Sequence, residues 1–317
     1  MLKIVIVGYG QMFANLILGC IDSGHNVVGV MRHDRVLLDP ASLNIKDFFA
    51  PSEDKTFIDS LKLYEIKAHS TNSNKFRKEL LRLNPDILLV GSWSEKISKQ
   101  TLNIPKIASI NCHPSLLPKY RGPNPYAQVI INGETKTGIS FHLMDSKFDT
   151  GAILHQAETP IYNSDTGESL KLRCTAQARK EIQVLLNNLE NEIIVPIEQN
   201  ERYASYQKQL CEKDILIDFN QTSEEIDRKI RGLTPWLKTY ITCKNKFFKV
   251  GDYKIIENKT NIKEPASIVR KGGKSLQIIC ADGKLIEFRN LKMLGFLSFI
   301  RTEHFIKNII KINDKAI

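Results

Sequence analysis

The first thirty residues restrict the fold more than any other part of the chain. Lys3–Gly8 is an almost unbroken β-branched run, which is typical of a parallel strand buried on both faces. A glycine turn, Gly8–Gly10, then precedes a stretch of helical character, Met12–Ser23, and a second apolar run, Asn26–Met31. This order of strand, turn, helix and strand predicts a doubly wound α/β domain with a mostly parallel sheet.

The same turn argues against a dinucleotide site, although the fold expected is Rossmann-like. The fingerprint G-x-G-x-x-G needs a third glycine, and Phe13 stands in its place. No acidic residue closes the second strand, which ends at Met31 and Arg32. We therefore do not expect NAD to bind here.

A polar pair follows a short strand in the middle of this domain. Lys106–Ile110 is partly β-branched, and Pro105 and Pro114 bound the region, so a strand is expected. Residues two apart in a strand point to the same face, which places Asn111 and His113 side by side. The pair would lie at the carboxyl end of a strand, where open α/β sheets bind ligands.

These side chains can support acyl transfer to a nucleophile that the substrate carries. An amide such as that of Asn111 can donate to a developing oxyanion, and the imidazole of His113 can carry a proton at neutral pH. The carboxylate of Asp149 could orient that imidazole or raise its basicity. The residues alone also allow a plain reading, in which Asn111 caps a turn, His113 is a core histidine and Asp149 closes a turn.

The segments around Asp149 are expected to be strands. Thr137–Met144 alternates between apolar and polar residues and leads into the turn that carries Asp149, and Ala152–Gln156 follows as another strand. His142 is expected to be a strand residue with a polar partner. Cys112, between Asn111 and His113, should face the opposite way and serve packing.

The longer pattern resembles the catalytic signature of the folate-dependent formyltransferases. That signature is Asn-x-His-Pro-Ser-Leu-Leu-Pro, then Tyr-Arg-Gly, then Met-Asp, three residues and Asp-Thr-Gly. The matching positions are Asn111, His113–Pro118, Tyr120–Gly122, Met144, Asp145 and Asp149–Gly151. The resemblance implies an N-formyltransferase that uses 10-formyltetrahydrofolate and needs no metal.

The resemblance also implies roles for three residues. A neutral primary amine would attack the formyl carbon while His113 assists proton movement and helps to hold the oxyanion. Asn111 would donate a hydrogen bond to that oxygen. Asp149 would orient and charge His113, or position a water that takes the proton of the amine.

Folate contacts are implied for a loop and for parts of the signature. The positions concerned are Trp93, Glu95, Lys96, Ile97, Ser115, Leu116, Leu117 and Asp145. In the loop, Ser94 replaces the glycine of the family and Lys96 replaces an apolar residue, so the contacts there are open, and Trp93 could equally be ordinary core. Arg121 could bind a phosphate or carboxylate of the acceptor, or it could fix its own loop.

The character of the chain changes near residue 200. Gln199–Lys208 is polar and without clear period, so we expect an interdomain linker there, between a folate-binding catalytic domain at 1–205 and a second domain at 206–317. A long helix, Leu170–Leu189, precedes it, and Ser164–Glu168 is expected to be its start, with Ser164 or Asp165 as the cap. Ser223–Arg231 is expected to be a capped helix.

The second domain is expected to be a small OB-like β-barrel. The strand-sized pieces are 217–219, 240–242, 246–250, 253–256, 266–269, 275–280 and 284–288. Ile230-Arg-Gly-x-x-Pro-Trp236 also resembles the opening of the C-terminal domain of methionyl-tRNA formyltransferases. The usual sequel there is Pro-Gly-Ala, whereas Leu237-Lys-Thr follows here.

The positive charge lies mainly in the second domain. Residues 1–210 hold 24 of the 45 Lys and Arg and 22 of the 35 Asp and Glu, a net +2, which leaves +8 of the total +10 for residues 211–317. A basic domain can guide a polyanion such as RNA, or it can be a solvated surface with no partner.

The acceptor is the least determined part. Methionyl-tRNA, with a role in translation initiation, is favoured, and a nucleotide-linked amino sugar or another small amine is the alternative. The N-terminal Gly-Thr-Pro-x-Phe-Ala of the tRNA enzymes is matched only in part by Gly8–Ala14, and the region 33–54 has few basic residues. Folate hydrolysis and a noncatalytic RNA-binding protein are further alternatives.

Composition indicates an ordinary cytoplasmic globular protein. The sequence is 42% hydrophobic and 25% charged. It has no apolar run of the length that spans a membrane, and Met1–Gly8 is expected to be a strand and not a signal peptide. The six cysteines form no C-x-x-C pair, which argues against a zinc site and favours reduced thiols. Oligomeric state cannot be predicted from these features.

Overall fold

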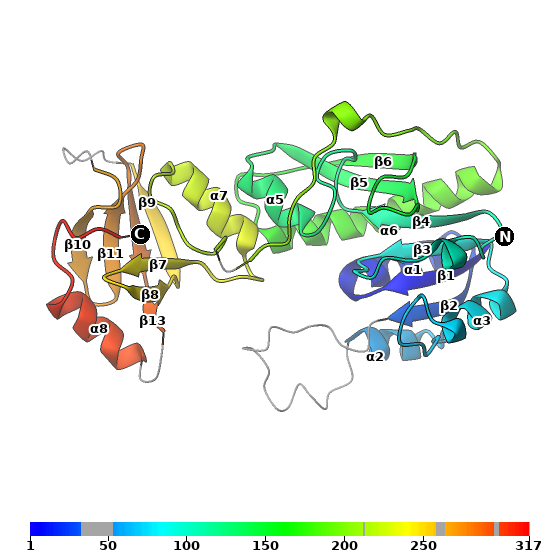
Figure 1. Ribbon diagram of the computed structural model, residues 1–317, viewed down its shortest axis with the longest axis horizontal. Coiled ribbons are helices and arrows are strands. Elements are labelled where there is room, and N and C mark those ends of the chain that lie inside the picture. The colour runs from blue at the N-terminus through cyan, green and yellow to red at the C-terminus, as the bar shows by residue number, and fades with distance from the viewer. Residues whose placement is uncertain (33–52, 212, 258–263, 295–297, 317) are drawn as a thin grey trace. The chain divides into compact units, whose positions relative to one another are not determined.

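The chain forms two compact units (Figure 1). The computed structural model describes residues 1–32, 53–211, 213–257, 264–294 and 298–316, so most of the region 33–54, which has few basic residues, lies outside the described residues. The first unit comprises Met1–Pro125, Lys136–Pro160 and Leu170–Gln207. The second comprises Tyr126–Thr135, Ile161–Ser169 and the described chain from Lys208 onward.

The first unit is built on one mixed sheet with the strand order β2-β1-β3-β4-β5-β6. The strands are β1 (Lys3–Gly8), β2 (Asn26–Arg32), β3 (Ile87–Gly91), β4 (Ala108–His113), β5 (Lys136–Leu143) and β6 (Ile153–Pro160). β2, β1, β3 and β4 are mutually parallel, whereas β5 and β6 are antiparallel to their neighbours. The predicted doubly wound, mostly parallel domain is confirmed.

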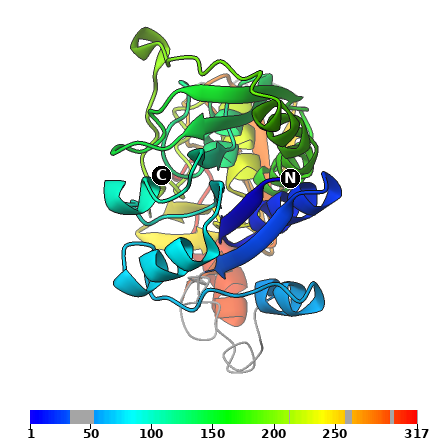
Figure 2. The same ribbon diagram turned by 90° about the vertical axis from the view of Figure 1, so that its right-hand side faces the viewer.

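Helices cover both faces of this sheet (Figure 2). The helices of this unit are α1 (Gly10–Asp22), α2 (Glu53–Ser60), α3 (Asn74–Leu83), α4 (Lys99–Leu102) and, from Leu170 onward, α6 (Gly167–Glu190). Side chains alternate along β1, so that Ile4 and Ile6 pack with α1 and α6, and Val5 and Val7 pack with α3 and α4. Burial on both faces explains why these strands are continuous apolar runs.

A carboxylate occupies the first turn of α1. The backbone N–H of Gly10 lies 2.9 and 3.1 Å from the two carboxylate oxygens of Asp54, a buried residue of α2. In dinucleotide-binding folds this helix terminus receives the pyrophosphate. Asp54 would repel that anion, which agrees with the missing third glycine.

The second unit is a small antiparallel β domain, and α5 (Pro125–Ile131) also belongs to it from Tyr126 onward. Its other elements are α7 (Ser223–Leu233), β7 (Tyr240–Cys243), β8 (Lys246–Lys249), β9 (Asp252–Ile256), β10 (Ile268–Gly272), β11 (Ser275–Ile279), β12 (Leu285–Arg289), β13 (Lys292–Met293) and α8 (Ser298–Asn308). The strands form two sheets, β10-β11-β12-β9 and β13-β8-β7. The predicted capped helix is α7, where Thr222 and Glu225 form a capping box.

The C-terminal segment joins the two sheets of this domain. Lys315 pairs with Ser267 just before β10, and Ala316 pairs with Cys243 at the end of β7. Within the described residues no strand pairing links β9 to the three-stranded sheet. The strands therefore curve around one core as two bridged sheets and not as a single continuous ladder.

Two local predictions are wrong. Ile217 and Phe219 are buried but form no strand, because the backbone turns at Asp218, whose side chain and carbonyl accept from Asn220 and Gln221. The helix predicted to start within 164–168 begins at Gly167, but its cap is Thr166, whose Oγ1 accepts from Ser169 N at 3.2 Å, and not Ser164 or Asp165.

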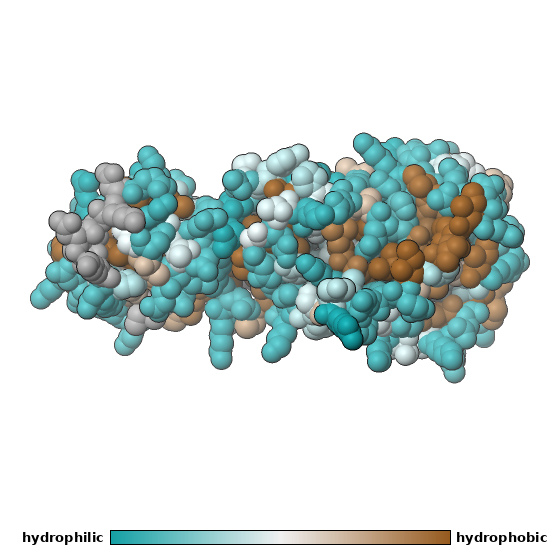
Figure 3. All heavy atoms as spheres, turned by 90° about the horizontal axis from the view of Figure 1, so that it is seen from above, coloured by the Kyte–Doolittle hydropathy of each residue, from teal (hydrophilic) through white to brown (hydrophobic). Residues whose placement is uncertain are grey.

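The polar stretch expected to be a linker is bonded to the first unit. Just before it, Ile197 pairs with Ile153 at the end of the sheet, and within it Tyr206 pairs with Arg121. Figure 3 shows apolar side chains gathered over the first unit on one face. In the segment after α6, Ile193, Val195 and Ile197 are exposed.

No helix in the described part of the chain combines the length and the apolar character needed to cross a bilayer.

Gly8 is predicted to be essential to the packing of β1 against β3. A Cβ atom there would lie 2.2 Å from the carbonyl oxygen of Gly91, and backbone cannot yield easily. We expect Gly8→Ala to destabilise the first unit by about 2 kcal/mol, as overpacked cores do, which lowers the melting temperature by roughly 4–8 °C.

Gly272→Ala is the matched control, because the nearest atom to its Cβ would be Ser275 Oγ at 3.8 Å. Differential scanning calorimetry of both variants would test the prediction. Equal melting temperatures for Gly8→Ala and the parent protein would contradict it.

Candidate active site

β4 presents Asn111 and His113 on one face of the sheet. Ile110 and Cys112 alternate with them and are buried in the core beneath α1 and α6. Cys112 is therefore a packing residue, as its place in the strand predicts. Asn111 is half-buried, whereas His113 is only 5% exposed.

β5 adds a second histidine to the pair. The antiparallel register places His142 directly opposite Asn111, with 3.1 Å between the amide Nδ2 and the ring Nε2. His142 Nδ1 lies 2.7 Å from the carbonyl oxygen of Leu143, which can only accept, so Nδ1 carries a hydrogen. In the neutral ring Nε2 therefore accepts from the amide. The polar partner expected for His142 is thus Asn111 itself.

Asp149 lies at the centre of this cluster. Its Oδ1 is 3.3 Å from Asn111 Nδ2 and 3.6 Å from both His113 Nδ1 and His142 Nε2. Its Oδ2 accepts from the backbone N–H of Gly122 at 2.9 Å. The structure therefore brings together the three side chains that the sequence singles out as catalytic candidates, and it adds His142.

The surroundings of Asp149 favour an ionised carboxylate. Burial alone would raise its pKa, but the neighbouring His113 and His142 and the N–H of Gly122 outweigh burial and hold the pKa well below the usual range. An anion needs donors around it, which fixes the amide of Asn111 with its nitrogen toward Asp149. Both N–H groups of Asn111 are then engaged, one with Asp149 and one with His142.

The proton on His113 can be located from its contacts. Nε2 lies 2.8 Å from the carbonyl oxygen of Tyr120, so Nε2 carries a hydrogen. Burial lowers the pKa of His113, and the carboxylate of Asp149 and the Tyr120 carbonyl, which act the other way, do not fully offset it. The ring is therefore neutral at pH 7, and its basic nitrogen, Nδ1, faces Asp149.

The turn that carries Asp149 is held from within. Asp145 is exposed, and its carboxylate accepts from Lys147 N and Thr150 Oγ1, both at 2.7 Å. A Cβ on Gly151 would lie 1.9 Å from the carbonyl oxygen of Leu143, so only glycine fits. The Asp-Thr-Gly sequence thus follows from the shape of the turn.

The guanidinium of Arg121 is held by hydrogen bonds to neighbouring side chains. The residue is 6% exposed, and its guanidinium donates to Gln199 and to Glu201. Of the two roles that the sequence allows, this geometry favours fixing the loop over binding an acceptor.

The loop after β3 holds the first group of expected folate contacts. Ile97 is buried, and Trp93 packs against the same core. Glu95 accepts from Thr71 N at 2.8 Å and from three side chains of residues 70–72, so it ties the loop to the segment before α3. Lys96 is exposed, and its carbonyl accepts from Asn72 Nδ2 at 2.8 Å.

The signature residues after His113 are mostly internal. Ser115 is fully buried and donates to the carbonyl of Lys119 at 2.7 Å, and Leu117 is buried, while Leu116 is half-buried. Side chains of Ser115 and Leu117 therefore shape the loop, and a ligand could meet them only through the backbone.

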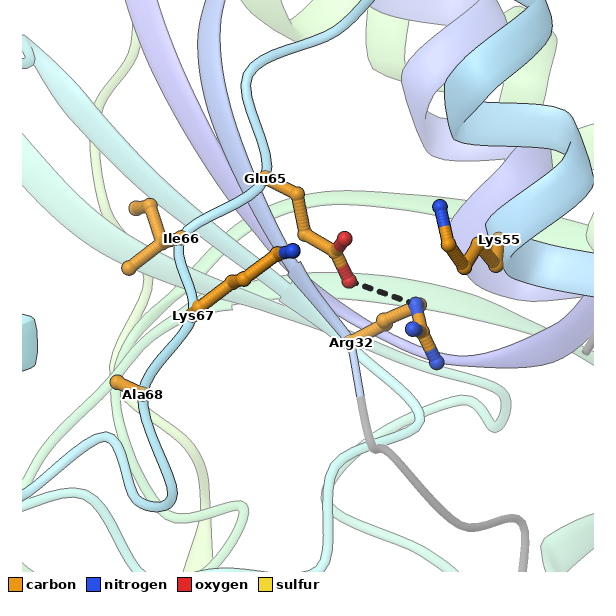
Figure 4. A pocket seen from close by; sticks show the side chains of 6 residues that line it. All are labelled: Arg32, Lys55, Glu65, Ile66, Lys67 and Ala68. Atoms are coloured by element: carbon orange, nitrogen blue, oxygen red, sulfur yellow. Dashed lines mark ion pairs between the residues drawn. The ribbon is translucent and has the colours of Figure 1, made fainter. Parts of the chain in front are cut away.

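A small basic pocket lies apart from this cluster (Figure 4). Its volume is about 160 Å³, and it lies at the carboxyl end of β2, which β1 and β3 separate from β4. Arg32, Lys55, Glu65, Ile66, Lys67 and Ala68 line it. Arg32 pairs with Glu65 at 2.7 Å and Lys55 with Asp59 at 2.6 Å, so much of its charge is compensated locally. In the described residues no cluster of His, Cys, Asp or Glu could hold a metal ion.

Solved structures show the same fold. An N-formyltransferase from Helicobacter canadensis, solved with folinic acid and dTDP-3-aminofucose, has a TM-score of 0.67 at 19% identity, over 91% of this chain and 99% of that one. A sugar 3N-formyl transferase solved with dTDP and 5-N-formyl-THF has a TM-score of 0.63 at 20% identity, and the match covers 94% of this chain and 99% of that one.

Sequence relatives are more similar. The methionyl-tRNA formyltransferase of Buchnera aphidicola subsp. Acyrthosiphon pisum is 31% identical over 299 residues, which cover 93% of this chain and 91% of that protein. The enzyme of the same name from Clostridium novyi is 31% identical over 305 residues, which cover 95% of this chain and 96% of that protein.

Family models match both parts of the chain in order. The model described as formyl transferase matches residues 2–186, and the model described as formyl transferase, C-terminal domain, matches residues 209–301. With the polar cluster at the carboxyl end of β4, these matches show that the chain belongs to the formyl transferase family and is a formyltransferase enzyme.

Proposed function

We propose that this enzyme transfers the formyl group of 10-formyltetrahydrofolate to the α-amino group of methionyl-tRNA. Asn111, His113 and Asp149 are the catalytic groups, within a catalytic, folate-binding domain at 1–205, and 206–317 is the domain that meets the RNA. The observation that carries formyl transfer is the convergence of an amide and a neutral imidazole on the ionised carboxylate of Asp149.

The reaction begins with a neutral amine. An α-amino group has a pKa of roughly 7.7–8.0, so a useful fraction is unprotonated at neutral pH. Its nitrogen attacks the formyl carbon, and negative charge develops on the formyl oxygen. Asn111, the half-exposed member of the cluster, donates to that oxygen in competition with His142.

The attacking nitrogen must then lose a proton. His113 Nδ1 is the basic atom of the cluster, and it faces Asp149, whose charge stabilises the imidazolium that forms. Asp149 itself is a poor final acceptor because its pKa is lowered. When the bond between the formyl carbon and folate N10 breaks, N10 takes up a proton, which leaves tetrahydrofolate and the formylated amine.

Two observations support methionyl-tRNA as the acceptor. Relatives of that name match more than nine-tenths of both chains at 31% identity, against 19–20% for the sugar enzymes. The excess positive charge lies beyond residue 210, where it would attract a polyanion.

A nucleotide-linked amino sugar is the second candidate. It is favoured by the fold of the Helicobacter canadensis enzyme, which was solved with dTDP-3-aminofucose and is covered almost completely by this chain. The folate ligands of both structural neighbours support a folate co-substrate in either case.

Tetrahydrofolate release from 10-formyltetrahydrofolate distinguishes these acceptors. We expect turnover with methionyl-tRNA and none with nucleotide-linked 3-amino or 4-amino sugars, and we expect the rate with tRNA to fall as salt is raised. Uncharged tRNA is the control. Turnover with an amino sugar alone would overturn the tRNA proposal, and release without any amine would indicate hydrolysis.

Asp149→Asn should reduce kcat/KM by about 100-fold or more, the range of general acid–base catalysis. The acceptor amine sets a first acidic limb at pH roughly 7.7–8.0. A second acidic limb should lie below pH 6.5 in the parent profile, because burial lowers the pKa of His113 and activity is lost as that ring takes up a proton. In the variant this second limb should move lower still, since the carboxylate no longer raises this pKa.

Asp59→Asn is the control, because Asp59 is exposed on α2 and pairs only with Lys55 among the ion pairs of the described residues. Steady-state kinetics between pH 5 and 9 would provide both profiles. If the His113 limb moved to higher pH in Asp149→Asn, that result would refute the statement that the carboxylate of Asp149 raises the pKa of His113.

A further inference from the structure

The segment from residue 196 to 207 lies against the turn and loop of the candidate site. Ile197 and Ile153 exchange backbone hydrogen bonds of 2.9 and 2.8 Å. Further along, Arg121 N donates to Ser205 O at 2.9 Å, and Gln207 N donates to Arg121 O at 2.8 Å. The segment is thus fixed at both ends, with Gln199 between them.

Gln199 uses both ends of its side-chain amide. Nε2 donates to the carbonyl oxygens of Asp149 and Gly151, at 2.9 and 2.8 Å. Oε1 accepts from Arg121 Nε at 3.1 Å and from Nη2 at 2.8 Å. Since the guanidinium can only donate and the carbonyls can only accept, the orientation of the amide is unambiguous. The residue is 9% exposed.

Arg121 connects this amide to the rest of the site. Its Nη1 and Nη2 also donate to Glu201, at 3.1 and 2.7 Å. The residues on either side of Arg121 contact the catalytic candidates directly. Tyr120 O accepts from His113, and Gly122 N donates to the carboxylate of Asp149.

Asp149 needs this support because its backbone is unfavourable. Its φ is 57°, in the left-handed region that few residues other than glycine adopt. Such a conformation persists only when the surrounding structure holds it. Gln199 bridges the carbonyls on both sides of Thr150 and so closes this turn from outside.

We propose that Gln199 is a positioning residue for formyl transfer, acting through the backbone of the Asp149 turn. This proposal rests on the catalytic role that is proposed above for Asp149. Gln199 and Arg121 couple the turn to the Tyr120–Gly122 loop, so that the carboxylate stays 3.3 Å from Asn111 and 3.6 Å from His113. A displacement of about 1 Å at a reacting centre costs about 100-fold in rate.

The variant Gln199→Glu distinguishes two roles of Gln199: positioning the Asp149 turn for catalysis, and only attaching the segment 196–207 to the rest of the unit. The variant keeps the side-chain length and an oxygen for Arg121, but it replaces the two donors that face the carbonyls of Asp149 and Gly151. We expect kcat to fall by about 100-fold, while the KM for 10-formyltetrahydrofolate and the melting temperature stay near the parent values. Gln209→Glu, the same change at an exposed site, is the control.

A role in attachment alone predicts parental kcat for Gln199→Glu, and that result would overturn the proposal. If this variant folds poorly, Gln199→Met serves instead, assayed below its melting temperature. If Asp149 is displaced in the Gln199 variant, the acidic limb that reports His113 should move to lower pH, as in Asp149→Asn. A limb that stays at the parent pH would overturn the proposal. A parent enzyme inactive with every amine would instead disprove the proposed function.

Discussion

The arrangement of the site depends on one buried carboxylate. Asp149 receives Asn111 from β4 and Gly122 from the following loop, while His113 and His142 flank it. None of these segments is adjacent to the turn of Asp149 in sequence, apart from β5. The buried anion accepts hydrogen bonds from Asn111 and Gly122, so the interaction that stabilises the charge also ties β4 and the following loop to the turn of Asp149.

The electrostatic consequence is a division of roles between two neighbouring groups. Asp149 remains charged because the neighbouring His113 and His142 and the N–H of Gly122 outweigh burial and lower its pKa. His113 remains neutral at pH 7 because burial lowers the pKa of the ring. A neutral imidazole with its basic nitrogen toward a fixed negative charge is prepared to take a proton. This arrangement suits an amine nucleophile, which must lose one proton as it attacks.

Much of this could be predicted from local sequence. The period of two placed Asn111 and His113 on one face, and β-branched runs located the parallel strands. The importance of His142 depends on the register between β4 and β5, which no local pattern encodes. Gln199 lies fifty residues from Asp149 in a stretch without periodicity, so its contacts emerge only from the fold. Ile217 and Phe219 show the alternating apolar pattern of a strand because both side chains are buried, although their backbone forms no strand.

The most direct test is the protonation state of His113, measured by long-range ¹H–¹⁵N correlation on protein labelled at histidine. Loss of one signal in His113→Asn would assign the ring. The account predicts a neutral His113 at pH 7 with its hydrogen on Nε2, and a pKa below the ordinary value of about 6.5. A ring that is doubly protonated at pH 7, or that carries its hydrogen on Nδ1, would contradict the assignment of Asp149 as a permanent anion beside a neutral base.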